Sequence, residues 1–128
     1  MAGSSDLLAK NDLRTFASEV CADDPEIFGE LLGDCRNDIA EQFKNLREAR
    51  RSRSWRDFNR AAHSIKSAAR TFGSPLVKKL ALELEEMSDG GAEDEAAVDR
   101  KTKELRTACD RFEKELEKIG KDPAGFLS

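Results

Sequence analysis

The sequence contains no tyrosine, only three prolines and only one histidine in 128 residues. It has no run of alternating β-branched residues, whereas 38% of its residues are charged. These features favour an all-helical fold over a β-rich one. No run of 18 apolar residues occurs, so no membrane-spanning segment is predicted. The first residues lack the basic and apolar parts of a signal peptide, so we expect a cytoplasmic protein.

Charge and cysteine content exclude further classes of function. A net charge of -4 argues against general nucleic-acid binding. Cys21, Cys35 and Cys109 are widely spaced and form no CxxC pair. With a single histidine they predict no metal site, and we interpret them as reduced thiols. No GxxxxGK[ST] loop or other glycine-rich phosphate cradle is present, so ATP binding is not predicted.

Local start and stop signals divide the chain into helices. Asp24 followed by Pro25 predicts the start of a long helix that ends near residue 51. Ser54 and Asp57 resemble a capping box for a helix over about 55–72. Gly73 is placed to end that helix in a left-handed conformation, and Ser74-Pro75 restarts the chain at once.

The remaining elements complete a bundle. Asp6 is expected to cap a short first helix that carries apolar residues from Leu7 to Val20, and a last long helix follows the glycines at 90–91 and ends near Gly120. Together these elements predict an antiparallel, up-down-up-down four-helix bundle with a short additional N-terminal helix. We expect one domain over 6–120, preceded by residues 1–5 as a disordered N-terminus or cloning remnant. Residues 121–128 form a C-terminal tail that either frays or folds back onto the bundle.

The only histidine, His63, lies on the polar side of a predicted helix. At ~100° per residue it points about 140° away from the centre of the apolar band, formed by Phe58, Ala62, Ile65, Ala69 and Phe72. Basic and small polar residues lie within about 60° of it, namely Arg56, Arg60, Lys66, Ser67 and Arg70. This geometry disfavours a core histidine and leaves a solvated surface residue open. A lone imidazole among cations in an acidic chain indicates a nucleophile that meets phosphate.

Several motifs around His63 share one register. The segment Ala62-His63-Ser64-Ile65-Lys66 is followed by Gly73 and then by Leu82-Glu83-Leu84-Glu85. With the preceding Asp23-Asp24-Pro25-Glu26, these motifs resemble the histidine-containing phosphotransfer (HPt) domains of two-component phosphorelays, over roughly residues 12–118. The stretch from His63 to Gly73 is also similar to the phosphotransfer domain of chemotaxis histidine kinases.

The resemblance implies a reaction and its partners. A phosphoryl group would move reversibly between His63 and an aspartate of a response-regulator receiver domain, with a sensor or hybrid histidine kinase upstream. His63 would be the phosphoacceptor, and Lys66 would neutralise phosphoryl oxygens. No intrinsic cofactor or metal is implied, because Mg²⁺ is expected on the receiver. We therefore expect a monomeric phosphocarrier rather than an enzyme with kinase activity, with no nucleic-acid or membrane partner.

The surface around His63 is expected to bind the receiver through basic and small residues. These are Arg56, Arg60, Ser64, Ser67, Arg70 and Ser74. Members of the family usually carry glycine where this chain has Ser67, so a narrower choice of partners is expected. The chemotaxis branch further implies that Glu85 hydrogen-bonds to Nδ1 of His63 and orients the imidazole.

Two alternatives come from other functional classes. A helical adaptor would use the same bundle without phosphate chemistry, and His63→Gln would leave its function unchanged. A degenerate domain would bind a kinase or a receiver as an inhibitor, with Ser67 as the residue that impairs transfer. The presence of both His63 and Lys66 argues against the second alternative.

Overall fold

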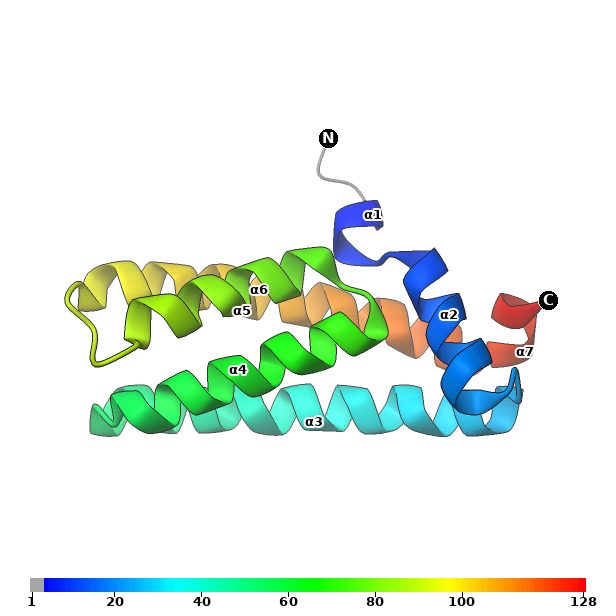
Figure 1. Cartoon of the computed structure of the whole chain (residues 1–128), viewed down its shortest axis with the longest axis horizontal. Helices are drawn as coiled ribbons and strands as arrows, with labels where there is room; N and C mark the ends of the chain where they lie inside the picture. Colours follow the sequence, from blue (N-terminus) through cyan, green and yellow to red (C-terminus); the bar gives the residue numbers. More distant parts are fainter. Residues whose placement is uncertain (1–3) are drawn as a thin grey trace.

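The computed structural model describes residues 4–128, with side chains from Asp6 onward. Within that range four long helices form an antiparallel bundle (Figure 1): α3 (Pro25–Ser52), α4 (Trp55–Phe72), α5 (Pro75–Ser88) and α6 (Glu95–Lys121). Each packs against the next in the chain, and α6 closes the bundle against α3. The all-α, up-down-up-down architecture predicted from the sequence is confirmed.

Short helices flank the bundle at one end. They are α1 (Ser4–Leu7), α2 (Lys10–Cys21) and α7 (Pro123–Leu127). The expected disorder of the N-terminus concerns residues 1–5, of which 1–3 lie outside the described residues, while Ser4 and Ser5 begin α1. No helix in the described range is long and apolar enough to cross a lipid bilayer.

The predicted caps set the ends of the bundle helices. The Asp24 carboxylate accepts hydrogen bonds from the backbone N–H groups of Glu26 and Ile27, and Pro25 opens α3. Gly73 ends α4 with φ of 80°, and its N–H donates to the Ala69 carbonyl. A side chain at Gly73 would bring its Cβ within 3.0 Å of the Ala9 carbonyl oxygen. Glycine is therefore required both by the backbone conformation and by this close approach.

One predicted helix and one predicted cap were wrong, although α4 begins at Trp55 as expected. The helix expected from Asp6 to Val20 is broken at Leu8, because Leu7 and Leu8 are both buried and the Ala9 N–H donates to the Gly73 carbonyl oxygen at 2.6 Å. Val20, expected on its apolar face, is 61% exposed.

The capping box at Ser54 is also absent. The Ser54 N–H already donates to the Ala49 carbonyl, so Asp57 has no backbone donor to reach. The Ser54 hydroxyl instead donates to the Asp57 carboxylate at 2.9 Å.

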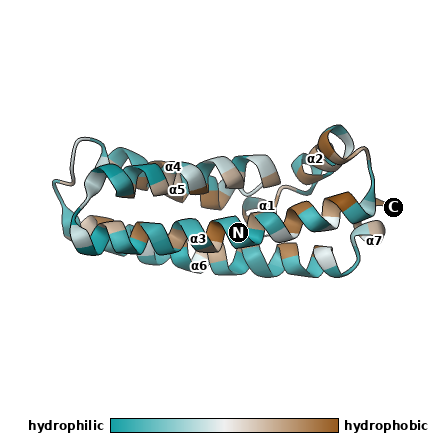
Figure 2. Cartoon of the chain, turned by 90° about the horizontal axis from the view of Figure 1, so that it is seen from below, coloured by the Kyte–Doolittle hydropathy of each residue, from teal (hydrophilic) through white to brown (hydrophobic). Residues whose placement is uncertain are grey.

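All four bundle helices contribute to the core. The largest fully buried side chains include Phe28 of α3, Phe58 of α4, Leu84 of α5 and Phe112 of α6. Figure 2 shows apolar residues recurring at intervals along α3 between hydrophilic ones. Such periodic burial places the polar faces outward, and each buried Phe or Leu contributes about 1.5–3 kcal/mol to stability.

The C-terminal tail folds back onto the bundle rather than fraying. After Asp122, α7 lies beside the start of α3 (Figure 1). The Phe126 ring stacks on Phe28, with 5.8 Å between ring centroids. The Asp122 carboxylate caps α7 by accepting from the Gly125 N–H. Apolar contact and a cap together order a segment for which fraying was one of two predicted outcomes.

Candidate functional site

Helix α4 presents His63 on its exposed side. The buried side of α4 carries Phe58, Ala62, Ile65 and Ala69, and the side chain of His63 is 55% exposed. The predicted separation of the histidine from the core is therefore present. An imidazole so placed can meet a second protein without unfolding any part of the bundle.

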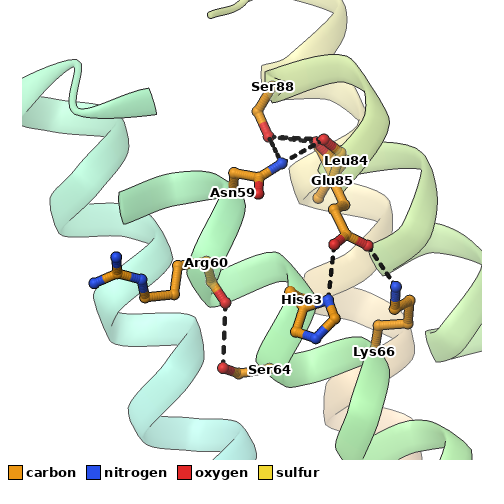
Figure 3. Close-up of polar contacts among 8 residues, drawn as sticks. All are labelled: Asn59, Arg60, His63, Ser64, Lys66, Leu84, Glu85 and Ser88. Carbon is orange, nitrogen blue, oxygen red and sulfur yellow. Dashed lines mark hydrogen bonds and ion pairs between the residues drawn. The ribbon is translucent and has the colours of Figure 1, made fainter. Parts of the chain in front are cut away.

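Glu85 of α5 joins the two residues of the motif. One carboxylate oxygen lies 2.7 Å from Nδ1 of His63, and the other lies 2.6 Å from Nζ of Lys66. All three side chains converge between α4 and α5 (Figure 3). The structure thus brings together His63, Lys66 and Glu85. The resemblance had implied the contact between Glu85 and His63, but not the ion pair between Glu85 and Lys66.

The shared carboxylate fixes the imidazole tautomer. Burial raises the pKa of Glu85, but hydrogen bonds from Lys66 and His63 outweigh it, so this pKa lies below its usual range. The carboxylate is then ionised at neutral pH and can only accept hydrogen bonds. Nδ1 of His63 must therefore carry a proton. In the neutral imidazole this leaves the lone pair on Nε2, which faces away from Glu85 (Figure 3).

Lys66 is less accessible than its helical position alone indicates. Its side chain is only 13% exposed, and its ammonium group binds Glu85 rather than extending into solvent. The Lys66 ammonium group and the His63 imidazole nevertheless bind the same carboxylate, that of Glu85. The site therefore contains one anion held between two donors, with the ring nitrogen Nε2 on the outside.

Beside His63 runs a shallow groove between α3 and α4 of about 340 Å³. Ser64 and Ser67 line it together with Asp38 of α3. The Ser64 hydroxyl donates to the Arg60 carbonyl one turn earlier, so it is directed along its own helix (Figure 3). Two of the small residues predicted to face a partner thus form one continuous surface with the imidazole.

The predicted arginines are exposed but do not converge on the imidazole. Arg56, Arg60 and Arg70 all lie at the surface of α4. The Arg60 guanidinium extends away from His63 on the side of α3 (Figure 3), where it lines a groove with Asp57. Arg60 therefore adds positive charge to the surface of α4 rather than a contact to the ring.

Ser74 was wrongly assigned to the partner surface. Its side chain is 1% exposed, and its hydroxyl accepts a hydrogen bond from the Val77 N–H. A serine between Gly73 and a helix-starting proline serves as the N-cap of α5, so it lies inside the turn.

Sequence reasoning missed two residues near the site. Asn59, one turn before His63, donates from Nδ2 to the Glu85 carbonyl oxygen at 2.7 Å. Ser88, at the end of α5, is buried and lies 3.3 Å from the same amide nitrogen. The only available signal was the spacing of four between Asn59 and His63, which places both on one face of α4.

None of the cysteines hydrogen-bonds to the His63 site, although Cys35 lines the groove beside it. Cys21, Cys35 and Cys109 are free and buried. Burial, with neighbouring acidic groups, raises the pKa of Cys35 and Cys109 to about 12, so both thiols stay protonated at neutral pH. Within residues 4–128 no three His, Cys, Asp or Glu side chains gather as metal ligands.

Comparison with known families identifies the same region. Residues 30–119, more than half of the chain, match the family model of the Hpt domain. This range contains the four bundle helices almost entirely, together with all three residues of the His63 site. No curated protein and no solved structure gives a significant match to the chain.

Proposed function

Because this chain belongs to the Hpt domain family, whose members transfer phosphoryl groups through histidine in two-component systems, we propose that it carries a phosphoryl group on His63. The donor and the acceptor are aspartates of receiver domains, one linked to a sensor or hybrid histidine kinase and one in a response regulator. The chain acts as a carrier without kinase activity of its own.

The observation that carries the proposal is the hydrogen bond between Glu85 and Nδ1 of His63. It holds the proton on the inner nitrogen and leaves Nε2 as an exposed nucleophile. In the transfer, the N–P bond forms at Nε2 while the P–O bond to the receiver aspartate breaks, and its electron pair leaves with that carboxylate. The ring gains positive charge as it attacks, and the Glu85 carboxylate stabilises that charge.

Positive side chains complete the proposed mechanism. Lys66 lies next to the ring and offsets the charge of the phosphoryl oxygens, while Arg56, Arg60 and Arg70 attract the acidic pocket of the receiver. Phosphoryl transfer depends mainly on positioning and on charge neutralisation, and we assign the Mg²⁺ that supports it to the receiver. The groove with Ser64 and Ser67 receives a helix of the partner.

The proposed setting is the cytoplasm and the proposed state is a monomer. Three free cysteines suit a reducing compartment. One exposed histidine on one bundle is a complete acceptor, so the reaction requires no second copy of the chain.

The test is transfer from a panel of receiver domains, each phosphorylated on aspartate and supplied with Mg²⁺. We expect at least one receiver to lose its label to the chain, as acid-labile and alkali-stable phosphate. Stable binding to a receiver with no label on the chain would instead support the adaptor or inhibitor alternative.

Lys66→Ala is expected to slow transfer about 10- to 100-fold, because one group that stabilises developing charge is removed. Receiver affinity should change little, since the ammonium group is largely covered. Stopped-flow transfer and calorimetric binding to the best receiver measure the two effects. Lys114→Ala, an exposed change on α6, is the matched control. Equal rates for both variants would remove Lys66 from the mechanism.

Ser67→Gly tests whether the serine narrows partner choice. The smaller residue should raise the rates of the slower receivers several-fold, because a partner helix can approach the groove more closely. Glycine inside α4 should also cost about 0.5–1 kcal/mol of stability. Ser18→Gly, on exposed α2, controls for that cost. Unchanged rates across the whole panel would show that Ser67 does not restrict partners.

A further inference from the structure

The end of α5 is closed by a side chain from α4. The last four carbonyl groups of a helix have no N–H partner inside it, and the Glu85 carbonyl is one of these in α5. The N–H of Asp89 donates to Glu86 instead, at 3.4 Å. Asn59 supplies the shorter of two replacement hydrogen bonds, with its Nδ2 2.7 Å from the Glu85 carbonyl oxygen. The other comes from the Ser88 hydroxyl at 3.2 Å, which lies closer to the Leu84 carbonyl at 2.8 Å.

The Glu85 carbonyl fixes the direction of the Asn59 amide, and Ser88 lies beside the same amide nitrogen. The buried Ser88 hydroxyl donates to the Leu84 carbonyl at 2.8 Å and lies 3.3 Å from Asn59 Nδ2 (Figure 3). Since a carbonyl oxygen can only accept, the Asn59 atom that faces Glu85 must be the amide nitrogen. The contact therefore has one possible orientation.

Glu85 is consequently held at three points by one face of α4. Asn59 binds its backbone carbonyl, His63 binds one carboxylate oxygen, and Lys66 binds the other. These α4 residues are spaced by four and three, so they lie in one line along the helix. Asparagine is a poor residue for a helix interior, and the bond to Glu85 offsets that local cost.

We propose that Asn59 is a positioning residue for the phosphotransfer site. By fixing the last turn of α5, it holds the Glu85 carboxylate at Nδ1 of His63 and so keeps the proton off Nε2. Without Asn59 the last turn of α5 frays, and Glu85 samples positions that no longer contact the ring. The expected effect of Asn59 on the transfer rate rests on the proposed function, whereas its expected effect on the His63 tautomer does not.

The experiment compares wild type with Asn59→Ala and with Ser88→Ala, a milder change that leaves the Asn59–Glu85 bond possible. Asn45→Ala is the matched control, because the Asn45 amide contacts only Gln42 on the surface of α3. Long-range ¹H–¹⁵N spectra at neutral pH report which ring nitrogen of His63 carries the proton. Transfer rates from one phosphorylated receiver and melting curves are recorded for the same proteins.

In wild type and Asn45→Ala we expect Nδ1 to be protonated. In Asn59→Ala the ¹⁵N chemical shifts of both ring nitrogens should move toward the average of the two tautomers. Transfer should slow about tenfold, as for loss of an outer positioning contact. Ser88→Ala should show a smaller shift in the same direction. A wild-type ring signal in Asn59→Ala would overturn the inference, as would protonation of Nε2 in wild type. If no receiver labels wild type, the proposed function fails while the ring spectra still decide the role of Asn59.

Discussion

His63→Gln is expected to abolish phosphoryl acceptance and to leave the fold intact. Glutamine has no nucleophilic ring nitrogen, so no N–P bond can form at this position. The His63 side chain is 55% exposed and lies outside the core, so the free energy of unfolding should change by no more than about 0.5 kcal/mol. Labelling by a phosphorylated receiver and chemical denaturation measure the two quantities on the same preparation.

Phe58→Ala, on the same helix, is the control for the stability measurement. Phe58 is fully buried, so its truncation should cost about 3–5 kcal/mol. A loss of that size in His63→Gln would contradict the placement of His63. Retained labelling in His63→Gln would show that another residue accepts the phosphoryl group.

Glu85→Gln is expected to slow transfer about 10- to 100-fold, more than Glu85→Ala does. The Lys66 ammonium can only donate, so it takes the amide oxygen of the new side chain. The amide NH₂ then faces Nδ1 of His63, which must accept, and the ring proton moves to Nε2. That nitrogen is no longer nucleophilic. In a buried catalytic triad, holding the histidine in the wrong tautomer lowers the rate about 10⁴-fold. A smaller loss is expected here, because the exposed ring of His63 can rotate into water and return to the reactive tautomer.

The measurement is single-turnover transfer with wild type, Glu85→Gln and Glu85→Ala, with Glu86→Gln as the control on the exposed side of α5. In Glu85→Ala, water replaces the carboxylate and permits both tautomers, so a smaller loss is expected. A faster rate for Glu85→Gln than for Glu85→Ala would contradict the tautomer mechanism. In wild type, the low pKa of Glu85 keeps the carboxylate ionised across the neutral range.

Helix ends with local signals were predictable from the sequence. Asp24, Pro25 and Gly73 act through their own side chains or backbone, so their roles are encoded in adjacent residues. The break at Leu8 was not predictable, because it depends on a bond from Ala9 to Gly73, distant in sequence. The prediction for Ser74 was wrong for a related reason. A serine at this position can either cap a helix or lie exposed at the surface, and here it caps α5.

The residues of the candidate site also differ in how far the local sequence predicts their positions. Helical periodicity was enough to place His63 on the outer side of α4, but it did not predict that Lys66 is largely covered and bound to Glu85. Glu85 came only from the resemblance, because its approach depends on the register of α5 against α4. The role of Asn59 depends on that register too. Periodicity within α4 places Asn59 on the face of His63, but it does not predict the contact with Glu85.

The most direct test is to locate the phosphoryl group on wild-type protein after incubation with a phosphorylated receiver and Mg²⁺. Tandem mass spectrometry at alkaline pH identifies the residue, and ³¹P–¹H NMR distinguishes the two ring nitrogens. We expect a single phosphoryl group on Nε2 of His63. Phosphate on Nδ1, on Ser64 or Ser67, or no phosphate from any receiver would contradict this expectation.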